Sequence, residues 1–197
     1  PGNVAAMNNY ANSLKALGKF EQSKDLYEKI LNIDPMYLRA YNNYANLKTS
    51  YNDYDGAIDL FKKAISLIKK NKNIPISQHL EFMFSLAVAY QGYNKVKESN
   101  EVIEEMLQIN PLHTGAHKLK SSILKYSEEN KDSLDHLKKM EDLNNTTNLN
   151  DDEKIDLFFS LGKAYEDIKD FDKAYNFLKE ANELRFKKFG SNLKNEK

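Results

Sequence analysis

The sequence predicts an all-α fold, a right-handed αα superhelix of about five helix-turn-helix repeats. Three observations predict this fold class. Apolar residues recur at helical spacing along most of the chain, the N-terminal part matches itself at an offset of 34 residues, and turn residues separate the predicted helices. A repeat of this size cannot bury its apolar face alone, so each repeat is expected to pack against its neighbours.

The clearest helix pair lies near the C-terminal end of the chain. Phe158, Leu161 and Tyr165 fall at i, i+3 and i+7, which places them on one face of a helix. Gly162 lies beside that face, and Ala174 takes the matching place on the next helix. Because small side chains let two backbones come close, we expect an antiparallel helix hairpin here.

The same pattern recurs along the whole chain. An offset of 34 residues pairs ten identical or similar residues of the N-terminal part, beginning with Asn8 and Asn42. The small residues of the predicted first helices are Ala11, Ala45, Ala87, Ser121 and Gly162, and those of the second helices are Ser23, Ala57, Ser99, Ser133 and Ala174. The first set has spacings of 34, 42, 34 and 41, so two junctions carry insertions of eight and seven residues.

This order of residues resembles the tetratricopeptide repeat (TPR): an aromatic residue, two residues, Leu-Gly, two residues, Tyr, and then Ala, three residues and a large apolar residue. A closer resemblance covers the run from Lys154 to Phe189. It looks like the last TPR unit of bacterial proteins in which a TPR array precedes a sulfotransferase domain. The first resemblance implies a solenoid whose first helices line a concave groove.

We therefore expect one TPR solenoid over residues 4–189. Its predicted repeats lie at about 4–37, 38–71, 80–113, 114–147 and 155–189, with insertions at 72–79 and 148–154. Residues 1–3 are expected to be a cloning remnant or disordered, and residues 190–197 a disordered tail.

Asparagines recur on the predicted first helices and are the main candidates for function. The TPR resemblance implies that such residues hold the backbone of an extended peptide, and an amide side chain both donates and accepts hydrogen bonds. The core positions of the first helix are expected to be Met7, Tyr10, Ala11 and Leu14. The predicted peptide-binding residues are Asn8, Asn12, Lys15, Arg39, Asn42, Asn46, Phe84, Gln91, Lys118 and Lys163. The alternative is that these are ordinary solvated residues of an asparagine-rich chain.

The composition narrows the classes of partner. Lys plus Arg and Asp plus Glu number 29 each, so the formal net charge is zero and gives no reason to expect nucleic acid or an anionic membrane. The absence of cysteine excludes disulfides and thiolate metal sites. No apolar run approaches the length of a membrane span and no signal-peptide core is present, so we expect a cytoplasmic protein.

The sequence favours no catalytic, metal or cofactor site. His113 and His117 are four residues apart, a spacing that suits a shared metal, but no further ligands accompany them, and His117 takes a core position. The TPR clamp for a terminal carboxylate is not expected either, because Asn8 fills its first lysine position. We expect this chain by itself not to be an enzyme.

The leading hypothesis is a non-catalytic module that binds an extended peptide or protein segment in a concave groove. One alternative is the non-catalytic TPR arm of a sulfotransferase whose catalytic domain is absent from this chain. A second is a homodimerising scaffold, with contacts through Tyr175, Phe186 and Phe189 of the C-terminal helix.

Overall fold

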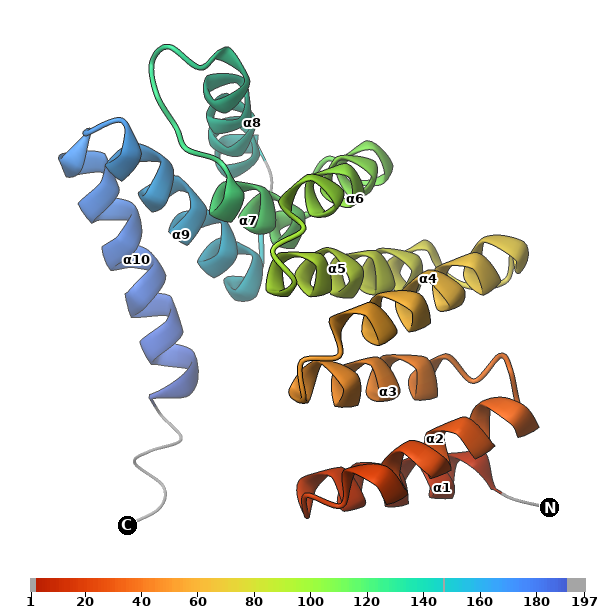
Figure 1. Ribbon diagram of the computed structural model, residues 1–197. Coiled ribbons are helices and arrows are strands. Elements are labelled where there is room, and N and C mark those ends of the chain that lie inside the picture. The colour runs from red at the N-terminus through yellow and green to blue at the C-terminus, as the bar shows by residue number, and fades with distance from the viewer. Residues whose placement is uncertain (1–2, 147, 191–197) are drawn as a thin grey trace. The chain divides into compact units, whose positions relative to one another are not determined.

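The computed structural model describes residues 3–146 and 148–190 of the chain. Within these residues it holds ten α-helices and no strand, arranged as an αα solenoid, so the predicted fold class is confirmed (Figure 1). The helices are α1 (Val4–Ala16), α2 (Phe20–Ile33), α3 (Leu38–Ser50), α4 (Tyr54–Lys70), α5 (Ile76–Gly92), α6 (Val96–Ile109), α7 (Thr114–Ile123), α8 (Lys131–Thr146), α9 (Asp151–Asp167) and α10 (Phe171–Phe189). None of these helices combines the length and apolar character that a bilayer crossing requires.

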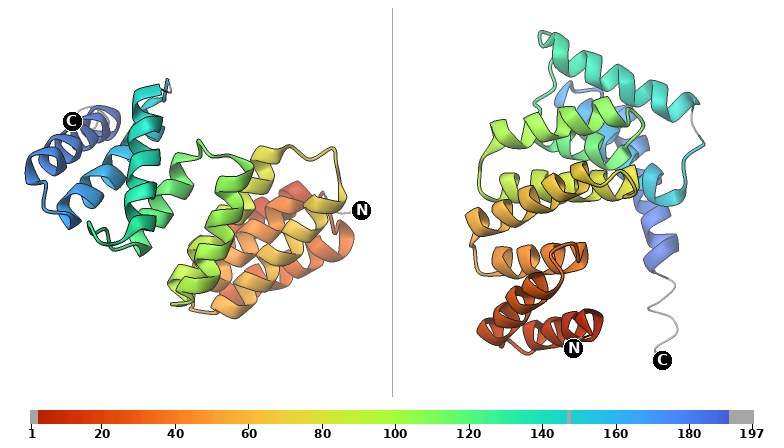
Figure 2. Two further views of the ribbon diagram at one scale, coloured as in Figure 1. Left: turned by 90° about the horizontal axis from the view of Figure 1, so that it is seen from above. Right: turned by 90° about the vertical axis from the view of Figure 1, so that its right-hand side faces the viewer.

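The chain divides into two compact units, residues 1–102 and 103–197, with the boundary inside α6. In unit 1, helices α1 to α5 lie side by side (Figure 2). Unit 2 holds α7 to α10. The single solenoid over residues 4–189 and its repeat boundaries stay a prediction. The predictions for residues 1–2 and 191–197 lie outside the described residues, whereas Asn3 is the N-cap of α1 and accepts hydrogen bonds from two backbone N–H groups.

Both predicted insertions are partly helical. Helix α5 begins at Ile76, so four residues of the segment at 72–79 belong to that helix. Helix α9 begins at Asp151, so four residues of the segment at 148–154 belong to it. Asn150 and Glu153 form a capping box at this start, in which each side chain accepts a hydrogen bond from the backbone of the other.

Small residues bring the two backbones of a hairpin together at several of the matched positions. In unit 1 the Ser23 hydroxyl donates to the Ala11 carbonyl at 2.8 Å, and the Ser99 hydroxyl donates to the Ala87 carbonyl at 3.0 Å. These two bonds join the same pair of positions in two different repeats. A buried serine therefore satisfies its hydroxyl at the place where another hairpin uses alanine.

Gly162 shows a close approach of this kind in unit 2. A Cβ atom added at Gly162 would lie 2.6 Å from Cγ and Cδ2 of Leu178 and 3.5 Å from the Ala174 carbonyl oxygen. There is no room for a branched side chain between α9 and α10. The small residue is thus a packing requirement of the hairpin.

The substitution Gly162→Val is expected to lower the free energy of unfolding by about 2 kcal/mol or more, because two methyl groups would overlap the Leu178 side chain. Urea denaturation followed by circular dichroism measures the change. Glu166→Val, an exposed position on the same helix, is the control and is expected to cost less than about 1 kcal/mol. Equal losses in the two variants would contradict the packing role of Gly162.

One residue expected in the core of the first helix is exposed. Tyr10 was expected in the core but is 60% exposed, and the prediction is wrong. Its equivalent Tyr44 is buried, because Tyr27 of the preceding hairpin stacks on it with ring centroids 5.7 Å apart. Among the residues that the structure describes, no hairpin precedes α1 to cover Tyr10 in the same way.

Candidate functional site

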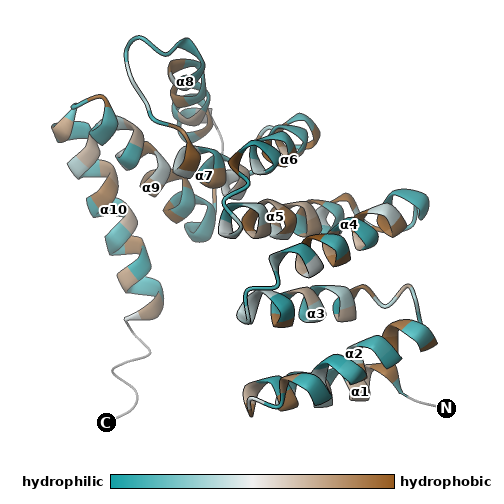
Figure 3. Cartoon of the chain, in the orientation of Figure 1, coloured by the Kyte–Doolittle hydropathy of each residue, from teal (hydrophilic) through white to brown (hydrophobic). Residues whose placement is uncertain are grey.

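A hollow of about 420 Å³ lies in unit 1 between α3, α4 and α5. Its floor is apolar and aromatic, and hydrophobic residues recur along α5 (Figure 3). Its lining residues are Asn46, Thr49, Tyr54, Phe61, Phe84, Ser85, Val88, Ala89 and Gly92. All of them belong to one compact unit, so the site does not depend on how the two units are placed.

Local packing fixes the floor of the hollow. A Cβ atom at Gly92 would lie 2.6 Å from the Tyr54 ring, so glycine makes room for the tyrosine at the end of α5. Tyr54 stacks on Tyr93 with ring centroids 5.7 Å apart, and the Tyr93 hydroxyl donates to Asp55 at 2.7 Å. These contacts join α4 to the end of α5 and hold the aromatic floor in place.

The polar groups of the hollow differ in what they can offer a ligand. The Thr49 hydroxyl donates to the Asn46 carbonyl at 3.0 Å, and the Ser85 hydroxyl donates to the Glu81 carbonyl at 3.1 Å. The side-chain amide of Asn46 is exposed, and none of the described residues hydrogen-bonds to it. The Asn46 amide can therefore both donate to and accept from a peptide group at this site.

The structure brings two of the predicted binding residues together, Asn46 and Phe84, which both line the hollow. Arg39 is exposed and Asn42 is half-buried, and they lie seven and four residues before Asn46 on the same helix. That spacing places all three on one face of α3. Lys15 on α1 and Gln91 on α5 are half-buried and do not line the hollow.

Two predicted asparagines are already bonded within unit 1. Asn8 is buried, and its Oδ1 accepts a hydrogen bond from Nδ2 of Asn43 at 3.0 Å. Asn12 is exposed, but its Oδ1 accepts from the Tyr27 hydroxyl at 2.5 Å. The amide of Asn8 therefore joins α1 to α3 and is not presented to a ligand.

The two predicted lysines in unit 2 form ion pairs. Lys118 pairs with Asp156 at 2.7 Å, which joins α7 to α9. Lys163 pairs with Asp167 at 2.6 Å and also donates to the Leu124 carbonyl. Their charges are partly compensated within unit 2, so they are weaker candidates for binding than the residues of the unit 1 hollow.

The sequence reasoning missed Thr49, Ser85 and the floor residue Gly92. Thr49 lies 34 residues after Lys15, so it is the second-repeat equivalent of a residue that was predicted to bind in the first repeat, and the repeat spacing could have identified it. Ser85 and Gly92 carry no signal of this kind. They line the hollow only because α4 and α5 meet there, which is a tertiary contact.

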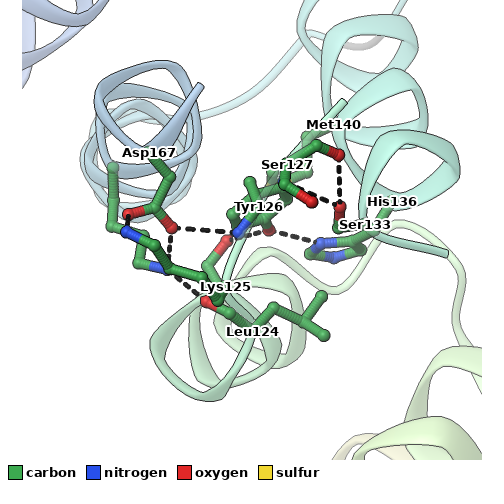
Figure 4. Close-up of polar contacts among 10 residues, drawn as sticks. Leu124, Lys125, Tyr126, Ser127, Ser133, His136, Met140 and Asp167 are labelled. Carbon is green, nitrogen blue, oxygen red and sulfur yellow. Dashed lines mark hydrogen bonds and ion pairs between the residues drawn. The ribbon is translucent and has the colours of Figure 1, made fainter. Parts of the chain in front are cut away.

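Unit 2 departs from the repeat pattern after Ile123, where α7 ends and Leu124 adopts an extended backbone. Asp167 of α9 holds this irregular segment: it accepts from Lys125 at 2.7 Å and from the Tyr126 backbone N–H at 3.1 Å (Figure 4). Burial raises the pKa of Asp167, but the hydrogen bonds from Lys125, Lys163 and the Tyr126 backbone outweigh it and lower the pKa to about 2.

The Tyr126 side chain enters the core of unit 2 and joins a chain of buried hydrogen bonds. His117 Nε2 lies 2.8 Å from the Pro111 carbonyl, which only accepts, so this nitrogen carries the proton. His117 Nδ1 then accepts from His136 Nε2 at 3.0 Å, and His136 Nδ1 accepts from the Tyr126 hydroxyl at 2.6 Å. The Tyr126 oxygen accepts from Ser121 at 2.7 Å. Both imidazoles are neutral, and every bond runs in one direction.

These histidines therefore belong to the packed core. The other member of the predicted pair, His113, caps α7 by accepting from the Ala116 N–H at 3.0 Å. Across residues 3–146 and 148–190, no three His, Asp or Glu residues gather in a way that would hold a metal ion.

Burial lowers the pKa of His136 to about 3, and nearby positive charge adds to the effect. The nearby charges are those of Lys120 and Lys139, and a proton on His117 would add to them. Burial also lowers the pKa of His117 and raises that of Tyr126 to about 12. Both histidines of this hydrogen-bonded network thus stay neutral across the pH range in which an exposed histidine gains a proton.

Acid is expected to destabilise unit 2. An unfolded histidine has a pKa near 6.5 and the folded His136 one of about 3. The unfolded chain therefore binds the proton between these values, and the free energy of unfolding falls as the pH falls. Between about pH 7 and pH 4.5, His136 is expected to contribute about 2 to 3 kcal/mol to this loss, measured by urea denaturation.

The control for this pH dependence is the double variant His117→Phe/His136→Phe. It is expected to be less stable at neutral pH, because Tyr126 and the Pro111 carbonyl lose their partners, but to lose less stability on acidification. If the double variant loses as much free energy of unfolding between the two pH values as the unsubstituted chain, the loss does not come from His136.

Two stretches of the chain match known protein families. Residues 3–70 and residues 155–188 each match a family model described as tetratricopeptide repeat. No curated protein is similar enough in sequence to count as a relative.

Several solved structures share the fold. One is MamA, with 18% identity, a TM-score of 0.59 and coverage of 90% of this chain and 95% of that one. Another is YrrB, described as a TPR protein with an unusual peptide-binding site, with 20% identity, a TM-score of 0.56 and coverage of 90% and 84%. A third is a putative kinesin light chain of Podosopora anserina with nearly identical TPR-like repeats, with 15% identity, a TM-score of 0.65 and coverage of 94% and 96%.

Proposed function

Because the chain belongs to the tetratricopeptide-repeat family, we propose that it is a non-catalytic protein-protein interaction module. Its unit 1 takes an extended segment of a partner protein across the hollow between α3 and α5. The observation that carries this proposal is the exposed Asn46 amide beside an open apolar floor. YrrB, a TPR protein whose description names a peptide-binding site, supports the class of ligand.

The chemistry of the hollow fits an extended peptide. Such a peptide turns alternate side chains to opposite sides, so one apolar side chain can enter the hollow while the flanking backbone faces Asn46. At about 420 Å³ the hollow lies within the range of ligand pockets, roughly 300 to 1,000 Å³. Phe84 and Val88 supply apolar surface at its edge, and the Asn46 amide pairs with a peptide group whatever its side chain is.

The charge beside the hollow selects among peptides. Arg39 lies two helical turns before Asn46 on the same face of α3, so a ligand that continues along α3 meets a cation. We propose that the preferred segment has one large apolar residue for the hollow and an acidic residue placed toward Arg39. A guanidinium group binds a carboxylate through paired hydrogen bonds, which would fix the direction of the segment.

Peptides selected from a displayed random library on the purified chain test this proposal. The double variant Asn46→Ala/Val88→Glu is expected to weaken the selected peptides at least tenfold, about 1.4 kcal/mol, from a micromolar dissociation constant. The reason is that it removes the amide and places a charge at the apolar edge. Isothermal titration calorimetry measures the affinity.

The matched control is Asn32→Ala/Ile33→Glu, the same two kinds of change at exposed positions on α2. It is expected to leave the affinity unchanged. Equal binding to the two double variants, or a library that yields no peptide specific for this chain, would contradict the proposed site.

The sulfotransferase arm stays an alternative prediction, and the resemblance of residues 154–189 is the observation that favours it. The coding sequence beyond Lys197 tests it: a strand followed by a nucleotide-binding loop would support it, and further repeats would argue against it. A bacterial source, a cytoplasmic location and the lack of nucleic-acid or membrane partners likewise stay predictions from the sequence.

A further inference from the structure

Helix α10 of unit 2 carries a stripe of exposed aromatic side chains. Phe171, Tyr175, Phe186 and Phe189 are 64%, 66%, 72% and 56% exposed. Their positions differ by 4, 11 and 3 residues, which at 3.6 residues per turn places all four along one face of the helix. A row of large apolar side chains on one face marks a surface that another element covers.

The same face is covered by a helix in unit 1. Ile58 follows the small residue Ala57 on α4 as Tyr175 follows the small residue Ala174 on α10. Ile58 is 4% exposed, because α5 packs against α4. No helix of the described part of the chain covers the stripe on α10. The equivalent face of α4 thus packs against a helix, and a helix is the kind of element expected on this face of α10.

The aromatic residues are arranged symmetrically along α10. Phe171 and Phe189 are each nine residues from position 180, and Tyr175 and Phe186 are five and six residues from it. We propose that the stripe binds the same stripe of a second copy of this chain, with the two α10 helices antiparallel. Phe171 then meets Phe189 of the second copy, and Tyr175 meets Phe186 of the second copy.

The charges beside the stripe agree with this pairing. Lys179 and Glu183 lie on one flank of the stripe, and their charged atoms are 4.0 Å apart within one chain. The midpoint between Lys179 and Glu183 in the sequence is position 181, one residue from position 180, on which the aromatic residues are centred. In an antiparallel pair, side chains on the same flank face each other, so each Lys179 meets Glu183 of the second copy. The charges of the two copies attract in this register.

The size of the surface indicates a weak dimer. A large aromatic side chain buries about 150 to 250 Å² in full, and these residues are about two-thirds exposed, so the two stripes together would bury roughly 1,000 Å². That area lies at the lower end of specific interfaces. The expected dissociation constant is in the micromolar range, which makes the oligomeric state depend on concentration.

Sedimentation velocity of the whole chain from about 1 µM to about 1 mM tests the proposal. The weight-average mass is expected to rise from that of one chain toward that of two. A mass of one chain throughout would overturn it. The double variant Tyr175→Glu/Phe186→Glu is expected to weaken association more than tenfold, and the control Tyr10→Glu, at an exposed aromatic residue of α1, is expected to leave it unchanged. Association that persists in the double variant would overturn the proposed surface.

A charge exchange tests the antiparallel register separately. Lys179→Glu is expected to weaken the dimer severalfold, because it places two carboxylates opposite each other. Lys179→Glu/Glu183→Lys restores opposite charges across the pair and is expected to recover the original association. Circular dichroism confirms that each variant is folded. A double variant that associates as weakly as the single one would overturn this register.

Discussion

The close approach of two helix backbones at small residues is the contact on which the rest of this structure depends. In the hairpins α1–α2, α5–α6 and α9–α10, alanine, serine or glycine at the matched positions lets the first and second helices pack closely. The close contact is possible without loss of hydrogen bonds because a buried serine such as Ser23 donates to the facing carbonyl. Each hairpin buries one face against the next and leaves another face open. In this fold, function is therefore expected on open faces and not in a central core.

The two units keep the same hairpin but use different interactions to complete it. Unit 1 packs tyrosine and phenylalanine rings between successive helices, as between Tyr27 and Tyr44. In unit 2 the regular helix ends at Ile123, and polar groups join the segment that follows to its neighbours. Asp167 binds the Tyr126 backbone, and His117 and His136 bond to each other in the core. A buried polar network fixes geometry well only when every member is bonded. It also makes unit 2 more sensitive to acid than aromatic packing would.

Sequence periodicity was sufficient for the all-α fold class, the small-residue contacts at Ser23, Ser99 and Gly162, and two lining residues of the candidate site. It failed where burial depends on neighbours, since Tyr10 and Tyr44 occupy the same repeat position and only Tyr44 is covered. It also could not show that Asn8 is used internally by Asn43, because that depends on the rotation of α1 against α3. The break after α7 carries no glycine or proline, so only the tertiary contacts of Tyr126 explain it. The hollow itself exists because α4 and α5 meet at Gly92, which no single-helix pattern encodes.

The most direct test of the account is an NMR titration of the 15N-labelled chain with a selected peptide, followed through the side-chain amide signals of asparagine. The Asn46 side-chain signals are expected to shift with the same affinity as binding, together with backbone signals of α3 and α5, because these helices line the hollow proposed to take the peptide. The side-chain signals of Asn32 on α2 are expected not to move. Saturating peptide that leaves Asn46 unshifted and moves signals elsewhere would contradict the claim that the open face of unit 1 is the binding site.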